Sequence, residues 1–172
     1  CGSAYHVGAV AQYVMEDLAE IPVRVDVASE FRYRKPLLDK NGLVIVVSQS
    51  GETADSLAAL REAKEYGVKT LAIVNVIGSS IAREADHVFY TMAGPEIAVA
   101  TTKAYSTQLT AVYCLALQFA LVRKKLSEEK CAALIAELQS LPGKMEKILE
   151  DKERIQWFAS KYAMAKDAFF IG

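Results

Sequence analysis

The 172-residue sequence has no excess of positive charge, because 20 Lys and Arg face 21 Asp and Glu and leave a formal net charge of -1. Proteins that bind nucleic acid need a basic face, so this balance argues against a nucleic-acid partner. No basic stretch followed by an apolar run marks a signal peptide at the start. The most apolar stretch, residues 109–122, is too short for a membrane span and is interrupted by Gln118. We therefore expect a cytoplasmic chain without a membrane partner, in which this stretch forms a buried helix.

Cysteine and histidine are also scarce. The cysteines Cys1, Cys114 and Cys131 are odd in number and form no CxxC pair, which is typical of reduced thiols in the cytoplasm. We expect Cys114 to be an inert core residue on the apolar helix. His6 and His87 lie far apart with no cluster of Cys or carboxylates near them. The sequence thus predicts neither a metal site nor a cofactor.

The chain is otherwise rich in hydrophobic residues, at 52%, which is typical of a globular domain with a core. Strand and helix patterns alternate in its first half. This rhythm predicts an α/β fold with a doubly wound parallel sheet in three layers, α/β/α. We expect helices over residues 3–20, 53–66 and 79–86, a turn or short helix over 29–34, and strands over 22–28, 43–47, 68–76 and 87–91.

After residue 91 the pattern changes to a loop followed by long helices. We expect helices over residues 104–125 and 128–141, a break at Pro142 and Gly143, a charged helical segment over 144–161, and a strand over 168–171. The missing initial methionine and this last strand suggest a piece of a longer protein.

The segment "SQSGET" follows the apolar strand over residues 43–47 directly. Ligands of doubly wound sheets bind beyond the carboxyl ends of the strands, which is where this turn lies. A helix that begins at the turn would direct its free N–H groups into it and favour an anion. Ser48, Ser50 and Thr53 add hydroxyl groups and Gln49 adds an amide, while no Lys or Arg occurs between residues 44 and 60. These features predict a phosphate site.

Simple helix capping by Ser50 or Thr53 is an alternative, since capping favours the same residue types. Neither GxxxxGK[ST] nor GxGxxG after a strand is present. A small phosphoester is therefore a better candidate than a nucleotide.

Two other segments combine glycine with a helix start. In "CGSAYH", Gly2 and Ser3 would present free N–H groups beside the first turn. Cys1 as an N-terminal nucleophile is an alternative, but such hydrolases have layered antiparallel sheets rather than alternating strands and helices.

In "GPEIAVATTKAY", the backbone near Val99 and the hydroxyl of Thr101 could form a wall over the ligand, although a loop with a helix cap explains the same residues. Lys103 lies unfavourably in a first helical turn, so we expect a carboxylate such as Glu96 to pair with it.

Three segments, "CGSAYHVG", "VVSQSGETADS" and "AGPEIAVATTKAYSTQL", together resemble signatures of the sugar isomerase (SIS) fold. More narrowly they resemble the isomerase half of the glutamine–fructose-6-phosphate aminotransferases, and the likeness covers nearly the whole chain. The resemblance implies that Ser48, Gln49, Ser50 and Thr53 bind the phosphate of fructose 6-phosphate or glucosamine 6-phosphate. It implies that Gly2, Ser3, Val99 and Thr101 lie near the sugar. The family usually has Thr-Ser after Cys-Gly, so Ala4 here lacks a hydroxyl group.

The resemblance also implies a domain plan: a first SIS domain over residues 1–141 without its first strand, connecting helices over 142–165, and the opening strand of a second SIS domain over 166–172. The catalytic residues of the family lie in the second SIS domain and the C-terminal tail, so none is expected here. A homodimer is expected, with glutaminase and second SIS domains elsewhere in the parent chain. The terminal strand could fill the empty first-strand position.

Two other functions stay open at this point. SIS domains also occur as phosphosugar sensors in transcription regulators, and other phosphosugar isomerases or deglycases share the fold. The loop "GPEIAVATTKAYSTQL" favours the aminotransferases.

Overall fold

A computed structural model describes residues 2–97 and 101–169 of the chain. The chain divides into two compact units, Cys1–Glu128 and Glu129–Gly172. The domain boundaries expected at residues 141 and 165 stay a prediction.

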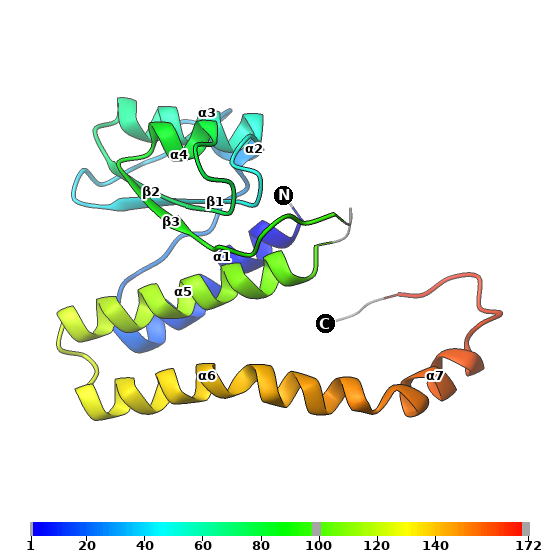
Figure 1. Cartoon of the computed structure of the whole chain (residues 1–172). Coiled ribbons are helices and arrows are strands. Elements are labelled where there is room, and N and C mark those ends of the chain that lie inside the picture. Colours follow the sequence, from blue (N-terminus) through cyan, green and yellow to red (C-terminus); the bar gives the residue numbers. More distant parts are fainter. Residues whose placement is uncertain (1, 98–100, 170–172) are drawn as a thin grey trace. The chain divides into compact units, whose positions relative to one another are not determined.

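A parallel sheet forms the centre of the first unit (Figure 1). Its strands are β1 (Leu43–Ser48), β2 (Lys69–Val74) and β3 (His87–Tyr90), and their order is β1-β2-β3. Ser48 pairs in register with Val74, and Val74 with Tyr90. The carboxyl ends of the described strands therefore meet at one edge of the sheet, and the loops that follow them are neighbours.

Helices cover both faces of the sheet. Helices α1 (Ser3–Ala19) and α5 (Lys103–Val122) pack together on one face, while α3 (Ala54–Glu65) and α4 (Ser80–Glu84) lie on the other, with the short α2 (Ala28–Phe31) against α3. This is the three-layer α/β/α fold that the sequence predicts.

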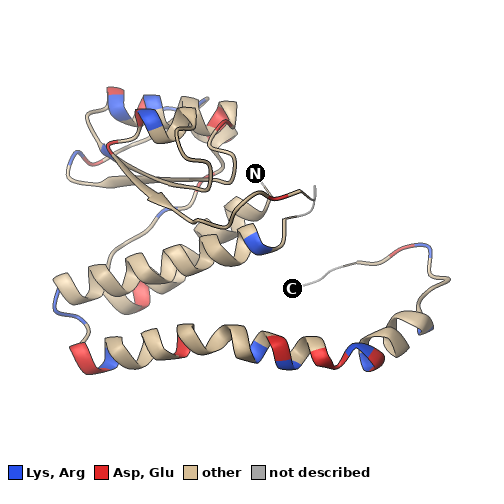
Figure 2. Cartoon of the chain, in the orientation of Figure 1, with Lys and Arg blue, Asp and Glu red and all other residues tan. Residues whose placement is uncertain are grey.

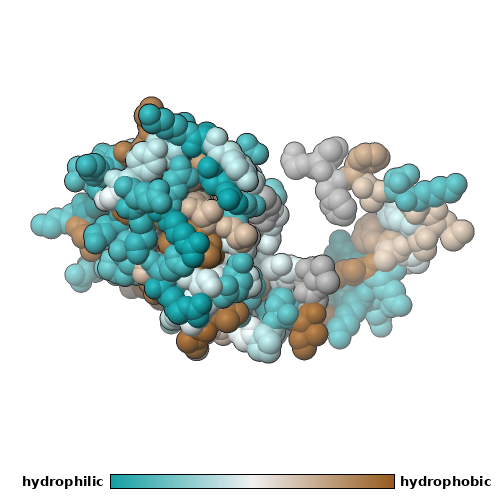
Figure 3. All heavy atoms as spheres, turned by 90° about the horizontal axis from the view of Figure 1, so that it is seen from above, coloured by the Kyte–Doolittle hydropathy of each residue, from teal (hydrophilic) through white to brown (hydrophobic). Residues whose placement is uncertain are grey.

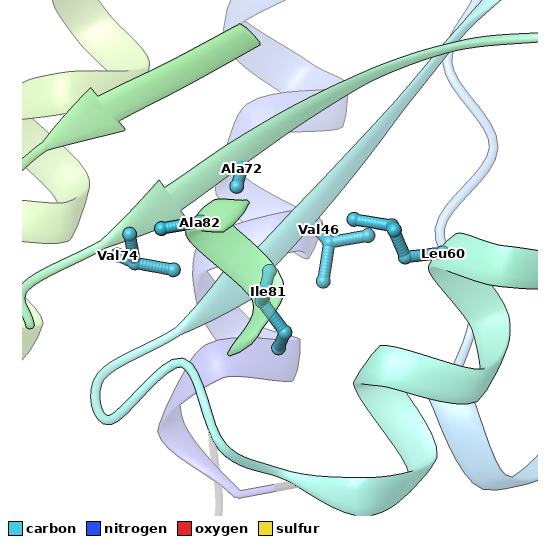
Figure 4. Close-up of a cluster of buried hydrophobic side chains, with 6 residues drawn as sticks. All are labelled: Val46, Leu60, Ala72, Val74, Ile81 and Ala82. Carbon is cyan, nitrogen blue, oxygen red and sulfur yellow. The ribbon is translucent and has the colours of Figure 1, made fainter. Parts of the chain in front are cut away.

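Successive side chains of β2 point to opposite faces of the sheet, and each face has its own hydrophobic core. Figure 4 shows the cluster under α3 and α4, to which β2 contributes Ala72 and Val74. Ile73 points the other way and packs with Val7 of α1 and with Ala111 and Val112 of α5. A strand with apolar residues on both sides must be covered twice, which explains its continuous hydrophobic run.

The strand predicted over residues 22–28 is wrong, because the described residues there form no strand until α2 begins at Ala28. The alternating pattern has no neighbouring strand to pair with. Instead, the N–H of Val23 donates to Glu16 Oε1 at 3.1 Å, and the N–H of Val27 donates to Asp26 Oδ1 at 3.1 Å. The side chains of Glu16 and Asp26 thus accept the backbone hydrogen bonds that a neighbouring strand would accept in a β-sheet.

The prediction of a long apolar helix is confirmed by α5, although two details are wrong. By length and composition α5 could cross a membrane. In this fold it buries one face, including Ala111 and Val112, against α1 and the sheet. Only 33% of its apolar stretch is buried, so the helix is less buried than expected. Cys114, expected in the core, is exposed because it lies on the opposite side of the helix.

The second unit consists of nearly all of α6 (Glu128–Glu150) and of α7 (Lys152–Lys161), and both helices carry basic and acidic residues (Figure 2). The break predicted at Pro142 is wrong, because α6 continues through it. Proline fixes a helical φ, so it removes a hydrogen bond without forcing the chain out of the helix. Apolar side chains such as Ile148, Leu149 and Trp157 are exposed. Figure 3 shows hydrophobic residues beside hydrophilic ones on the surface of the chain.

Half of the predicted terminal strand, residues 170 and 171, lies outside the described residues. Ala168 and Phe169 are described and are not in a strand. Whether this segment fills the missing strand position stays a prediction.

Candidate functional site

The β1–α3 turn (residues 48–53) connects the carboxyl end of β1 to the start of α3, as the sequence predicts. Ser48 ends the strand and is buried, with 3% of its surface exposed. Gly51 reverses the chain with a φ of 68°, in the region that glycine adopts most readily. Thr53 is the N-cap residue directly before α3. The turn therefore lies at the sheet edge where parallel α/β folds bind ligands.

Hydrogen bonds of serine and threonine hydroxyl groups stabilise the conformation of this turn. Ser48 Oγ lies 3.1 Å from Thr53 Oγ1 and accepts a hydrogen bond from the N–H of Gly51, also at 3.1 Å. The N–H of Glu52 donates to Ser50 Oγ at 3.2 Å. The structure thus brings Ser48, Ser50 and Thr53 together around one short backbone segment.

Helix α3 has no side-chain cap, even though Thr53 occupies the capping position. The Thr53 hydroxyl contacts Ser48 instead, and the Ser50 hydroxyl closes the turn, so helix capping does not account for either residue. An α-helix without a cap leaves its first N–H groups for water or a ligand, at the positive end of its dipole. The turn can therefore accept an anion without a cationic side chain.

The only acidic residue of the turn faces away from the start of α3. Glu52 Oε1 accepts a hydrogen bond at 2.8 Å from the N–H of Ser80, the first residue of α4. Hydrogen bonding from Ser80 lowers the pKa of the Glu52 carboxyl, and the nearby charge of Arg83 acts in the same direction. The negative charge of Glu52 is thereby held at α4 and does not compete for the first N–H groups of α3.

Gln49 links the turn to the rest of the sheet edge. The main-chain carbonyl oxygen of Gln49 accepts a hydrogen bond from the N–H of Asn75 at 3.2 Å. Asn75, just after β2, accepts hydrogen bonds at Oδ1 from Thr91 Oγ1 and the N–H of Ala93, and donates Nδ2 to the Gly94 carbonyl. Asn75 therefore joins the loops after all three described strands, through its backbone N–H to the loop after β1 and through its side chain to the loop after β3.

Three residues that contact the β1–α3 turn were not identified from the sequence. They are Asn75, Ser79, which lies against Gly51, and Gln108, which donates to Gln49. Asn75 carried a usable signal, since it is a polar residue directly after a buried strand, as Ser48 is. Ser79 and Gln108 carried none, because their roles depend on contacts with Gly51 and Gln49 from distant parts of the chain.

The other predicted site residues belong to two further helix starts. Gly2 has a φ of 68° and precedes α1, which has no side-chain cap; Ser3 is half-buried. Thr101 is half-buried before α5. Figure 1 shows α1 and α5 beginning at the same end of their layer. No hydrogen bond joins Gly2, Ser3 or Thr101 to the β1–α3 turn among the described residues, and Cys1 and Val99 lie outside them.

The predicted pairing of Glu96 with Lys103 is wrong for the described part of the chain. Glu96 Oε2 instead accepts a hydrogen bond from the N–H of Ala104 at 3.4 Å, so its carboxylate lies at the start of α5. A backbone donor at a helix start attracts a carboxylate directly, without the lysine.

No metal cluster marks the β1–α3 turn among the described residues. The described residues contain no group of three or more His, Cys, Asp and Glu side chains suited to a metal ion. The described surface hollow belongs to the second unit and is lined by Lys147, Ile148, Asp151, Arg154, Ile155 and Phe158. The predicted site is the turn itself, at the edge of the sheet.

The sequence profile of the SIS domain matches residues 1–118, more than half of the chain. The chain belongs to the SIS domain family. Across all 172 residues it is 58% identical to a glutamine–fructose-6-phosphate aminotransferase [isomerizing] of Caldanaerobacter subterraneus subsp. tengcongensis and 59% identical to one of Clostridium tetani. It spans 28% of the length of each of these curated relatives.

A solved structure is similar over nearly the same extent. The C-terminal domain of glucosamine-fructose-6-phosphate aminotransferase from Francisella tularensis matches with a TM-score of 0.92 and 37% identity, over 95% of this chain and 47% of that one. The SIS fold predicted from the three sequence segments is therefore confirmed, and its relatives are aminotransferases.

Proposed function

We propose that this SIS chain is a phosphosugar-binding part of a glutamine–fructose-6-phosphate aminotransferase. Its ligand is a hexose 6-phosphate, either fructose 6-phosphate or glucosamine 6-phosphate. The phosphate occupies the β1–α3 turn, where Ser48, Ser50 and Thr53 donate from hydroxyl groups and Gln49 from its amide. The parent protein makes glucosamine 6-phosphate from fructose 6-phosphate and glutamine.

The observation that carries this proposal is the uncapped start of α3 at the carboxyl end of β1. Its free N–H groups favour an anion, and the hydroxyl groups of Ser48 and Thr53 already face each other across the turn at 3.1 Å. Two carboxylates lie near this helix start, and both are already engaged: Glu52 accepts from Ser80, and Asp55 in the first turn of α3 pairs with Arg32 at 2.8 Å. Inorganic phosphate alone should therefore compete with the sugar phosphate.

The sugar itself would extend toward the starts of α1 and α5. There Gly2, Ser3, Val99 and Thr101 supply backbone and hydroxyl donors, by similarity to the family. Ala4 offers no hydroxyl group, so we expect fewer contacts to the sugar on the α1 side.

The whole reaction needs parts of the parent protein that lie outside these 172 residues. We infer that amination and isomerisation are carried out by a second SIS domain and a C-terminal tail, with ammonia from a glutaminase domain, in a cytoplasmic homodimer. Residues 142–165 would connect the two SIS domains. The chain by itself is expected to bind hexose 6-phosphate but to show isomerisation only at background level. Sustained turnover by the purified chain would contradict this division of roles.

Calorimetric titration of the chain tests the binding site. We expect heat of binding with fructose 6-phosphate and with inorganic phosphate, and none with fructose. Thr53→Val keeps the side-chain shape but removes the hydroxyl group, so it should weaken binding of fructose 6-phosphate by roughly tenfold. Thr110→Val is a matched control, because this exposed threonine of α5 donates only to the Ser106 carbonyl. Equal affinity of wild type and Thr53→Val, or binding of fructose without phosphate, would contradict the proposal.

A further inference from the structure

Gln108 connects the core of the protein to the β1–α3 turn. It lies on α5 with only 1% of its surface exposed, the deepest burial of an amide side chain among the described residues. Its Nε2 donates to Gln49 Oε1 at 3.4 Å, across 59 positions of sequence. This is the hydrogen bond by which α5 contacts the turn among the described residues.

The direction of this hydrogen bond determines what Gln49 can offer to a ligand. An amide presents an oxygen acceptor on one side and an NH₂ donor on the other. Because Gln108 donates to the oxygen of Gln49, that oxygen is engaged with the core and the NH₂ group of Gln49 remains for another partner. The opposite polarity would leave the Gln49 oxygen as the free group, and an oxygen acceptor repels an anion.

The second polar atom of Gln108 is unsatisfied. Gln108 Oε1 is buried and has no hydrogen-bond partner among the residues that the structure describes. A buried acceptor without a donor lowers stability, so a glutamine is a poor choice for this core position on structural grounds alone. The hydrogen bond that the Gln108 side chain makes is the one from its NH₂ group to Gln49.

We propose that Gln108 is a positioning residue that orients the Gln49 amide, so that Gln49 donates its NH₂ group to the anion in the β1–α3 turn. The inference rests on the proposed phosphate site and adds a residue that never touches the ligand. It also makes phosphate affinity depend on the packing of α5 against the sheet.

Substitution of Gln108 separates this role from a structural one. Gln108→Met has a similar shape but neither donates nor leaves an unsatisfied oxygen. We expect fructose 6-phosphate and inorganic phosphate to bind roughly tenfold more weakly, while the melting temperature stays the same or rises. A purely structural glutamine would give the reverse, a lower melting temperature with unchanged affinity. Gln118→Met, at an exposed site of the same helix, is the control and should change neither quantity.

A double-mutant cycle tests whether Gln108 acts through Gln49. Gln49→Met should also weaken phosphate binding, and the double variant should bind no more weakly than Gln49→Met alone, because the residue that Gln108 orients is already gone. Additive losses would overturn the inference, as would full affinity of Gln108→Met.

A measurement on the unmodified chain does not depend on the folding of any variant. In an NMR titration with inorganic phosphate, the side-chain NH₂ resonance of Gln49 should shift at saturation. A Gln49 NH₂ resonance that stays fixed while phosphate binds would overturn the inference and remove Gln49 from the proposed phosphate contacts, while phosphate binding by the rest of the turn would still stand. If wild type binds no phosphate at all, the proposed function itself fails.

Discussion

Gly51 and Ser79 lie so close together that a Cβ atom on Gly51 would stand 2.0 Å from Ser79 Oγ and 2.5 Å from Ser79 Cβ. Ser79 is only 2% exposed, so it has little room to move. The carbonyl of Gly51 also accepts a hydrogen bond from the N–H of Ile81 at 3.0 Å. The β1–α3 turn is thus held against the start of α4 by close packing that excludes any side chain at position 51.

Gly51→Ala should therefore destabilise the protein through two effects. The positive φ costs about 1 kcal/mol for a residue with a Cβ, and the contact with Ser79 adds about 1–3 kcal/mol of overpacking. Gly67→Ala is the matched control, because Gly67 has a φ of 74° but nothing within 4 Å of the added Cβ. Its cost should be about 1 kcal/mol, from the backbone alone. Urea unfolding of both variants measures the difference, and equal losses would show that the Ser79 contact is unimportant.

Ser48→Ala should lower the free energy of unfolding by about 1–3 kcal/mol. The substitution removes the acceptor of the buried Gly51 N–H, which no water can replace there. Ser50→Ala is the comparison: Ser50 is exposed, so the N–H of Glu52 can turn to water, and the change should stay within about 0.5 kcal/mol. Denaturant unfolding checks both values. Similar losses at the two serines would mean that burial of the Ser48 hydroxyl has no energetic effect.

Asp86 should make the free energy of unfolding depend on pH in the acidic range. Its Oδ2 accepts hydrogen bonds from the N–H of Thr70 at 2.8 Å and from Thr70 Oγ1 at 2.9 Å, and this lowers the pKa of the Asp86 carboxyl in the folded protein. Because the folded pKa lies below the unfolded one, its contribution is complete above the unfolded value of about 4 and disappears as the pH falls through the folded value.

Asp86→Asn should consequently melt at a lower temperature than wild type at pH 7, and the gap should narrow below pH 4. Melting curves at pH 7, 5, 4, 3 and 2 measure this. Asp17→Asn is the control, since Asp17 is exposed on α1 and has no hydrogen bond or ion pair among the described residues. A gap between wild type and Asp86→Asn that stays constant down to pH 2 would contradict the assignment.

Pro142→Ala should strengthen α6 around the substituted position. Proline in a helix interior lacks the N–H that would bond to the Leu138 carbonyl, at a cost of about 3 kcal/mol relative to alanine. Amide hydrogen exchange across residues 138–146 should therefore slow markedly. Gly143→Ala, in the same helix and with open space around the new Cβ, should slow it less, because a helical glycine costs only about 1 kcal/mol. Exchange that is equally fast in Pro142→Ala and wild type would argue against a continuous helix there.

Local patterns determined much of this protein from the sequence alone. The continuous apolar runs of β1 and β2 indicated strands buried on both faces, and the small polar residues after β1 indicated a turn at the sheet edge where parallel α/β folds bind ligands. Both features follow from interactions within a few residues, so a reader of the sequence can find them. The same reasoning failed at residues 22–28, where polar and apolar residues alternate as in a strand but the described part of the chain has no neighbouring strand to pair with. It also failed at Pro142, where α6 continues despite the lost hydrogen bond.

Tertiary structure alone decided which side chains stabilise the turn and how. The contact of Ser79 with Gly51 joins residues 28 positions apart, and that of Gln108 with Gln49 joins residues 59 apart. Neither contact leaves a periodic trace in the sequence, because each depends on how α4 and α5 pack on opposite faces of the sheet. The sequence specifies a strand, a turn and a helix, whereas the packing of distant helices sets the orientation of the Gln49 amide.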